Sequence, residues 1–306
     1  MKPEELKFEH GTLWEKTLDR TERALKIGAL LPISTESTFF KDGGIDFLVR
    51  IISNLALKAE EKRGRTENGG FEKKSRNPFL PHEEEMFVAD ISDTHVCLLN
   101  KFNVIDHHLL IVTRSFEDQE ILLTPRDLEA IWTCMAEFEG LVFYNGGEVA
   151  GASQKHKHLQ MIPLPMAKNR PNVPIEPLFA SARFERGLGI VPGLPFVHSF
   201  ARLDPELVLH TSTASDVVFR LYRNMLEVVG LNRSDSPEKS RQSGPYNFLF
   251  TREWMLLVPR SEEFFESISV NALGFAGALL VQNEQQMQIL REHGCMSALK
   301  HTAIAD

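Results

Sequence analysis

The sequence predicts an α+β fold in which helices pack on antiparallel strands, arranged in two similar halves. Short apolar runs bounded by Asp, Asn, Gly and His predict strands, whereas longer segments with apolar residues every three or four positions predict amphipathic helices. Both halves of the 306-residue chain place strands near a long helix. We therefore expect an N-terminal half at 1–168 and a C-terminal half at 169–306, with a Pro- and Gly-rich crossover at 163–195.

The N-terminal half begins with two predicted helices, at 13–31 and 45–63, because apolar residues recur there at helical spacing. The segment 62–81 has an Asn-Gly-Gly core between basic residues and no apolar period, which predicts a long mobile loop. Strands are predicted at 86–91, 95–99 and 109–112. Thr124 and Pro125 then supply an N-cap and a first helical turn, so a helix is predicted from 124 to about 143.

The C-terminal half predicts a helix near 214–229, a charged loop at 234–244, two strands within 246–258 and a helix at about 264–292. One local match links the halves. LLIVTRSFED at 109–118 aligns with MLLVPRSEEF at 255–264 with five identities in ten. Because both copies end a predicted strand and lead toward a predicted helix, the match indicates an internal duplication.

Composition and charge exclude several classes of function. Acidic residues outnumber basic ones by 42 to 34, and the net charge of −8 argues against nucleic acid or an anionic membrane as a partner. No apolar run reaches the roughly 18 residues of a membrane span, and the first residues lack the apolar core of a secretory signal. The three cysteines are far apart, which argues against a disulfide framework. We expect a soluble, cytoplasmic protein.

The segment FYNGGEVAGASQKHKHLQMIPLP at 143–165 carries the predicted chemistry. Side chains two residues apart share one face of a strand, so His156, His158 and Gln160 are expected to line one pocket. The residues before them are small enough for a phosphate to approach their backbone N–H groups. These predicted phosphate-binding residues are Asn145, Gly151, Ala152 and Ser153. The loop lacks the Gly-Lys-Ser/Thr ending of a Walker A motif, so a P-loop enzyme is excluded.

An imidazole at this position predicts nucleophilic catalysis at phosphorus. The unperturbed pKa of histidine, about 6.5, leaves the ring mostly neutral and nucleophilic near pH 7. Attack by His158 would form a phosphoramidate and divide one difficult displacement into two in-line steps. Ser153 and Gln160 would donate hydrogen bonds to the equatorial oxygens as charge shifts.

The same segment resembles the active-site segment of the transferase branch of the histidine-triad superfamily, which includes galactose-1-phosphate uridylyltransferase and the diadenosine tetraphosphate phosphorylases (ATP adenylyltransferases). Hydrolase members usually carry a third histidine where this chain has Gln160. The resemblance to the phosphorylases covers most of the chain, through NPFLP at 77–81, LLNKFNVIDHHLLIVTR at 98–114 and YNFLFTREWMLLVPRS at 246–261. It implies two fused histidine-triad-like halves.

The resemblance also implies a reaction and roles. It makes His158 the nucleophile that takes up AMP, His156 a supporting residue, and Gln160, Ser153 and Asn145 the holders of the α-phosphate. The implied reaction is reversible phosphorolysis of diadenosine tetraphosphate to ATP and ADP, with inorganic phosphate as the second acceptor.

Further expectations concern the rest of the substrate. The resemblance places Tyr246 and Asn247 near the substrate's far end, and it implies that His108 is structural or lies near a nucleoside. Lys73 and Lys74 of the basic loop are expected to clamp the polyphosphate. Mg²⁺ is expected to accompany the polyphosphate. No zinc is expected, because the chain lacks the cysteine pair with which related uridylyltransferases bind it.

Two alternatives stay open at this point. One is the same histidine chemistry on a sugar nucleotide, as in a sugar-nucleotide phosphorylase or a hexose-1-phosphate nucleotidylyltransferase. The other is a non-catalytic nucleotide-binding regulator, although a pure binder has no need of a nucleophile.

Overall fold

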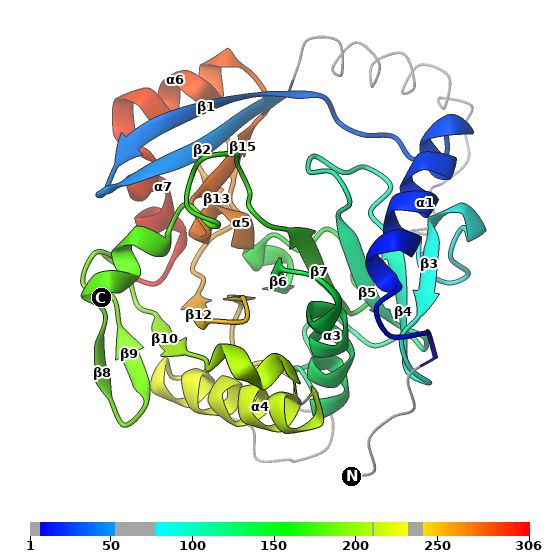
Figure 1. The fold of residues 1–306 in the computed structure, drawn as a ribbon. Coiled ribbons are helices and arrows are strands. Elements are labelled where there is room, and N and C mark those ends of the chain that lie inside the picture. The colour runs from blue at the N-terminus through cyan, green and yellow to red at the C-terminus, as the bar shows by residue number, and fades with distance from the viewer. Residues whose placement is uncertain (1–6, 53–76, 210, 232–240) are drawn as a thin grey trace.

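One ten-stranded antiparallel sheet organises the chain (Figure 1). The computed structural model describes residues 7–52, 77–209, 211–231 and 241–306. The sheet has the order β3-β4-β5-β7-β6-β11-β12-β10-β9-β8. Its strands are β3 (Phe87–Asp90), β4 (His95–Leu99), β5 (Leu109–Thr113), β6 (Gly140–Gly146), β7 (His158–Pro163), β8 (Arg183–Glu185), β9 (Leu188–Ile190), β10 (Ser199–Arg202), β11 (Tyr246–Phe250) and β12 (Trp254–Pro259).

The order of strands repeats around the β6–β11 pair at the centre of the sheet. The first set runs from β3 to β7 and the second from β8 to β12, and in the sequence each has three strands, a helix and two more strands. In the sheet, the last strand of each set lies between its third and fourth strands. In this repeat β7 matches β12, and β5 matches β10. The alignment of 109–118 with 255–264 is therefore wrong, because it pairs β5 with β12. His158 and Trp254 begin the two matched strands, so the second set has no histidine at that position.

Two apolar cores lie on opposite faces of the sheet. Leu159 and Met161 of β7 face the core formed with three helices, whereas Ile162 faces the other core. The helices of the first core are α1 (Leu13–Lys26), α3 (Pro125–Glu137) and α4 (Thr211–Val228). Alternation along β7 therefore directs His158 and Gln160 away from α3 and α4. None of the helices in the described ranges is long and apolar enough to cross a bilayer.

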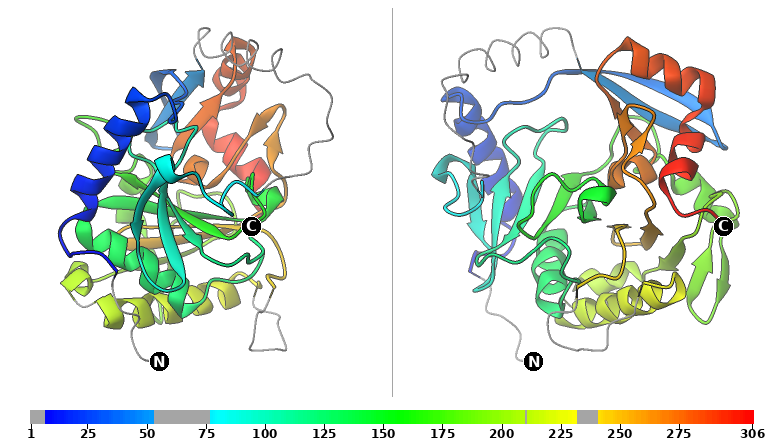
Figure 2. Two further views of the ribbon diagram at one scale, coloured as in Figure 1. Left: turned by 90° about the vertical axis from the view of Figure 1, so that its right-hand side faces the viewer. Right: turned by 180° about the vertical axis from the view of Figure 1, so that it is seen from behind.

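A second layer covers the other face of the large sheet (Figure 2). It contains a three-stranded sheet of order β1-β2-β15, a small β13–β14 hairpin and three short helices. Their bounds are β1 (Thr35–Asp42), β2 (Ile45–Ile52), β13 (Phe264–Phe265), β14 (Ile268–Ser269), α5 (Ala272–Phe275), β15 (Ala278–Val281), α6 (Glu284–His293) and α7 (Cys295–Thr302). Short 3₁₀ helices occur at Glu84–Met86, Glu148–Ala150, Glu176–Ser181 and Pro205–Leu209.

The predicted helix at 45–63 is wrong in its described part, because 45–52 form β2. Gly43 and Gly44 have φ angles of 56° and 85°, which permits a two-residue hairpin turn between β1 and β2. The β-branched residues of IDFLVRII then fit between β1 and the parallel strand β15. Residues 53–76, including most of the predicted loop at 62–81, lie outside the described residues.

Two other predicted helices differ from the structure, one in its end and one in most of its length. The helix predicted from 124 to about 143 ends at Glu137, and Gly140 already begins β6. The helix predicted at 264–292 is replaced by β13, β14, α5, β15 and α6. Asn271 caps α5, and Gly277 has a φ of 85°, so the chain turns there before β15. The two strands predicted within 246–258 are confirmed.

A buried ion-pair network joins the start of α3 to the residue between the two motif histidines. Thr124 and Asp127 form a capping box at the N-terminus of α3. Lys157, whose side chain is fully buried, donates to Asp127 at 2.8 Å, and His95 contacts the other carboxylate oxygen at 3.0 Å. Burial alone would raise the pKa of Asp127, but Lys157 and His95 lower it below its ordinary value.

Lys157→Met should therefore destabilise the fold strongly, because it leaves the buried Asp127 carboxylate without its cation. We expect the free energy of unfolding to fall by about 3–5 kcal/mol in denaturant titrations. Arg291→Met is the matched control, since Arg291 pairs with Glu284 on the surface and its loss should change stability little. Equal small effects for both variants would contradict a structural role for the Lys157 network.

Candidate active site

A cavity of about 610 Å³ lies between the first-half strands and the second layer. Its polar lining from the first half contains His108, Asn145, Ser153, His158 and Gln160. The second layer adds Asn271, Gln282 and Gln286, and apolar walls are formed by Phe79, Phe102, Ile105, Phe264 and Leu280. A cavity of this size, mostly apolar with a few converging polar groups, has the character of a small-molecule site.

His158 is held in the tautomer that a nucleophile needs. Its backbone N–H donates to Gln119 Oε1, and its ring Nδ1 lies 2.8 Å from the carbonyl oxygen of His156. Because a carbonyl oxygen can only accept, Nδ1 carries the proton and Nε2 keeps its lone pair. Burial lowers the pKa of His158 to about 4, so the ring is neutral at pH 7.

His156 is a fixed support behind the cavity rather than part of its lining. Its Nε2 donates to the carbonyl oxygen of Thr113 at 2.8 Å, and its Nδ1 accepts from Asn77 Nδ2 at 2.9 Å. The Phe79 ring packs against both histidines, with centroid distances of 5.7 Å to His156 and 5.3 Å to His158. The orientation of His156 thereby fixes the carbonyl group that holds His158.

Gln119 ties the two strands of the site together, and no sequence motif pointed to it. Besides accepting from His158 N, it donates through Nε2 to the carbonyl oxygen of Asn145 at 2.9 Å. Its side chain is 2% exposed. The Gln119 amide therefore holds the start of β7 against the end of β6, where Asn145 lies.

Gln160 is oriented by a hydrogen-bond relay through His108. The backbone N–H of Phe102 donates to Asn100 Oδ1, so Asn100 presents Nδ2 to His108 Nδ1 at 3.1 Å. His108 then donates from Nε2 to Gln160 Oε1 at 3.0 Å. Burial lowers the pKa of His108 to about 4, which keeps this ring neutral as well. Gln160 Nε2 is left as a donor at the cavity.

The side-chain amide of Asn145 is also oriented by hydrogen bonds to its oxygen. Its Oδ1 accepts from Asn247 Nδ2 at 2.9 Å and from the backbone N–H of Ala272 at 3.0 Å. Two donors occupy both lone pairs of this oxygen. Within the described part of the chain, Asn145 Nδ2 donates to no protein atom, so it remains a donor beside His158.

The loop between β6 and β7 differs from the predicted phosphate cradle. The backbone N–H groups of Gly151 and Ala152 donate to carbonyl oxygens of Glu148 and Gly147, so they do not point to a ligand. Gly151 still borders the cavity; its φ is 87°, and a Cβ there would lie 2.7 Å from the Cβ of Asn271. Ser153 is exposed and borders the cavity, and its contact with a phosphate stays a prediction.

Tyr246 and Asn247 do not border the cavity, which corrects the expectation that they contact the substrate. Both side chains are fully buried. The Tyr246 hydroxyl hydrogen-bonds with that of Tyr222 at 2.6 Å, and Asn247 supports Asn145 from behind. Both residues belong to β11, where they pair with Gly146 and Asn145 of β6. Their effect on the site is therefore transmitted through the sheet.

The expected polyphosphate clamp, Lys73 and Lys74, lies outside the described residues. Among the residues that are described, Arg50 and Lys101 are the Lys and Arg side chains that border the cavity. Lys101 pairs with Glu83 at 2.7 Å. The guanidinium of Arg50 donates to Ser37 Oγ, and burial lowers its pKa. Arg50 was missed by the sequence reasoning because its segment was taken for a helix.

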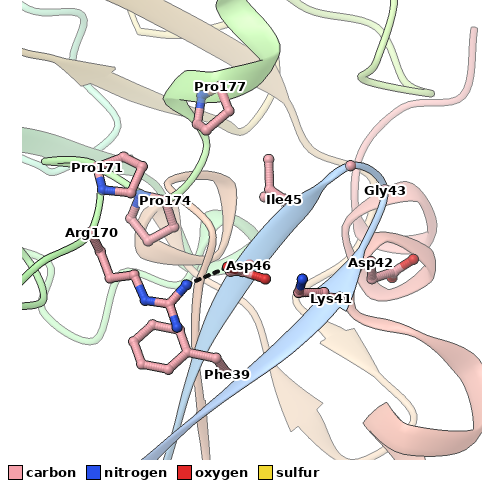
Figure 3. Close-up of a pocket in the computed structure, with 11 residues that line it drawn as sticks. Phe39, Lys41, Asp42, Gly43, Ile45, Asp46, Arg170, Pro171, Pro174 and Pro177 are labelled. Atoms are coloured by element: carbon pink, nitrogen blue, oxygen red, sulfur yellow. Dashed lines mark hydrogen bonds and ion pairs between the residues drawn. The ribbon is translucent and has the colours of Figure 1, made fainter.

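A second cavity, of about 660 Å³, lies between the β1–β2 hairpin and the segment 170–177 (Figure 3). Arg170 stacks over the Phe39 ring at 4.4 Å and pairs with Asp46. The lining of this second cavity holds no histidine, cysteine or hydroxyl side chain. In the described part of the chain, no group of three His, Cys, Asp or Glu side chains could hold a metal ion.

Known proteins resemble this chain over most of its length. The family described as Ap4A phosphorylase N-terminal domain matches residues 3–181, and the ATP adenylyltransferase C-terminal domain matches 192–305. The chain is 29% identical to diadenosine 5',5'''-P1,P4-tetraphosphate phosphorylase 2 of Saccharomyces cerevisiae, covering 92% of this chain and 90% of that protein. The structure of this chain is similar to that of yeast Ap4A phosphorylase Apa2, with a TM-score of 0.77 and 25% identity. The match covers 97% of this chain and 95% of Apa2. Apa2 in complex with AMP matches with a TM-score of 0.76, 25% identity and 97% coverage of both chains.

The titration of His158 and His108 tests the geometry without any substrate. We expect both rings to stay neutral until the pH falls near 4, with the proton on Nδ1 of His158 and on Nε2 of His108. Long-range ¹H–¹⁵N NMR spectra of ¹⁵N-histidine protein report both the tautomer and the pKa, and His158→Ala and His108→Ala assign the signals. An ordinary titration near 6.5 would contradict the buried, oriented rings.

Proposed function

The chain belongs to the Ap4A phosphorylase family, and from this membership we propose that it is a nucleotidyltransferase that converts diadenosine tetraphosphate and inorganic phosphate reversibly into ATP and ADP. The observation that carries the proposal is His158, a buried neutral imidazole with its free nitrogen at a cavity that two amide donors border. The yeast relative named above supports the choice of substrate.

In the first step, His158 Nε2 attacks the α-phosphorus of one adenosine. A nitrogen–phosphorus bond forms, the bond from that phosphorus to the bridging oxygen breaks, and ATP leaves with that oxygen. The AMP remains on His158 as a phosphoramidate. The neutral ring needs no proton removed before attack, because Nδ1–H already points to the His156 carbonyl oxygen.

In the second step, an oxygen of inorganic phosphate attacks the same phosphorus and releases His158, giving ADP. Both steps move negative charge onto the equatorial oxygens. Asn145 Nδ2 and Gln160 Nε2 are preorganised donors for that charge, and the Ser153 hydroxyl adds a third. Such donors accelerate transfer because they require no reorganisation when the charge develops.

Substrate binding follows from the rest of the lining. Apolar walls such as Phe102 and Leu280 suit an adenine ring, and Arg50 supplies positive charge for the polyphosphate. Mg²⁺ is proposed only as part of the polyphosphate substrate, bound through phosphate oxygens, and no step above runs through it. The buried free cysteines fit a reducing compartment, so we propose the cytoplasm as the location.

Replacement of the nucleophile tests the reaction. With wild-type protein, diadenosine tetraphosphate should give equal ATP and ADP only when inorganic phosphate is added. His158→Ala should reduce both directions by at least about 10⁴-fold with an unchanged melting temperature. Chromatographic product analysis checks both outcomes.

Turnover of His158→Ala at the wild-type rate would contradict the assignment of the nucleophile. Activity with a sugar phosphate, but none with inorganic phosphate, would instead select a sugar-nucleotide enzyme. Tight nucleotide binding without any turnover would select a regulator.

Gln160→Glu tests the donor role of Gln160. The carboxylate can still accept from His108, but it presents a negative oxygen to the substrate in place of Nε2. We expect kcat to fall by about 10²–10³-fold. Gln154→Glu adds the same charge at the cavity without touching the relay, so it should cost far less. Both variants are measured by steady-state kinetics. Similar losses of kcat would show that added negative charge alone causes the effect, which would contradict a donor role for Gln160.

A further inference from the structure

Arg260 is a buried cation that the mechanism above does not use. It is 2% exposed, and the hydrogen bonds it makes within the described ranges all run to neutral oxygens. It donates from Nε to the carbonyl oxygen of Thr302, from Nη2 to that of Glu262, and from Nη1 to Asn247 Oδ1 at 2.5 Å. The guanidinium also packs over the Phe275 ring at 5.1 Å. Burial lowers its pKa to about 10, which still leaves it charged at pH 7.

The bond from Arg260 determines how two asparagines are oriented. A guanidinium has five N–H groups and no acceptor, so Asn247 must present Oδ1 to it. Asn247 Nδ2 then faces the other way and donates to Asn145 Oδ1 at 2.9 Å and to the carbonyl oxygen of Ala150. Asn145, with its oxygen taken, must present Nδ2 to the cavity. An amide that lacks such an anchor could rotate by 180° at little cost in shape.

We infer that Arg260 is a positioning residue for nucleotidyl transfer, acting through Asn247 to hold Asn145 as a hydrogen-bond donor to the α-phosphate. The inference rests on the proposed function, because it assumes that Asn145 meets a phosphate. The relay crosses three neighbouring segments of the sheet, from the end of β12 through β11 to β6. Arg260 and Asn247 thereby act on the chemistry without bordering the cavity themselves.

The structure also ranks the expected losses. The backbone N–H of Ala272 still donates to Asn145 Oδ1 when the anchor is removed, so Arg260→Gln should cost about 10-fold in kcat/KM. Asn247→Asp keeps a partner for Arg260 but replaces the donor to Asn145 by a carboxylate oxygen. That oxygen repels Asn145 Oδ1 and favours the flipped amide, so a loss of about 100-fold is expected.

The experiment compares three single variants, Arg260→Gln, Asn247→Asp and Asn145→Ala. A double variant combines Arg260→Gln with Asn145→Ala. Each protein is measured for kcat and KM with diadenosine tetraphosphate, for AMP affinity by calorimetry and for melting temperature. Arg252→Gln is the matched control, because Arg252 donates from Nε to the carbonyl oxygen of Met135 at 2.8 Å and has no link to Asn145. It should leave kcat/KM unchanged.

If the relay operates, Arg260→Gln lowers kcat/KM in the wild-type background but changes it less than about 2-fold when Asn145 is already alanine. Independent, additive losses in the double variant would overturn the inference. Should Arg260→Gln fail to fold, Asn247→Asp decides the matter, since it keeps Arg260 and gives it a carboxylate partner. Unchanged AMP affinity and kcat/KM in this variant would overturn the inference equally.

The AMP measurement separates this inference from the proposed function. A wild-type protein that binds AMP but does not cleave the dinucleotide would contradict the function, whereas weaker AMP binding by Asn247→Asp would still support the relay. Normal turnover by the wild type together with normal AMP binding by Asn247→Asp would retain the function and reject the relay.

Discussion

The hydrogen bond from His158 Nδ1 to the carbonyl oxygen of His156 is the interaction on which the site depends. It places the proton on one ring nitrogen and leaves the other with its lone pair free. The bond is fixed because both ends are fixed: His156 is held by Thr113 and Asn77, and the His158 backbone is held by Gln119. Lys157, buried between the histidines, anchors the same stretch to the start of α3.

The polar side chains around the His158 ring share one feature: their acceptor oxygens are hydrogen-bonded on the side away from the cavity. Gln160 gives its oxygen to His108, and Asn145 gives its oxygen to Asn247 and Ala272. What remains toward the cavity is a pair of N–H donors, which suits an anion better than a cation. Each set of hydrogen bonds begins at an obligate donor, a backbone N–H in one case and the Arg260 guanidinium in the other.

Local patterns in the sequence predicted much of this, and long-range contacts account for what was missed. Alternation along 156–160 directed His158 and Gln160 into one cavity, but the expectation that His156 lines it too was wrong, because the strand begins only at His158. The run IDFLVRII was mistaken for a helix because a short apolar run satisfies both periods, and only pairing with β1 and β15 decides between them. Gln119 and Arg260 had no local signature, since their partners lie on other strands. The internal loop hydrogen bonds of Gly151 and Ala152 were likewise invisible in composition.

A covalent AMP on His158 is the central claim, and trapping it is its most direct test. The protein would be mixed with diadenosine tetraphosphate labelled at the α-phosphate, without inorganic phosphate, and quenched in base, where a phosphoramidate survives. The account predicts one equivalent of label on the peptide that contains His158, attached at Nε2, with release of ATP and discharge to ADP when phosphate is added. Rapid turnover with phosphate but no protein-bound label at any time would contradict it.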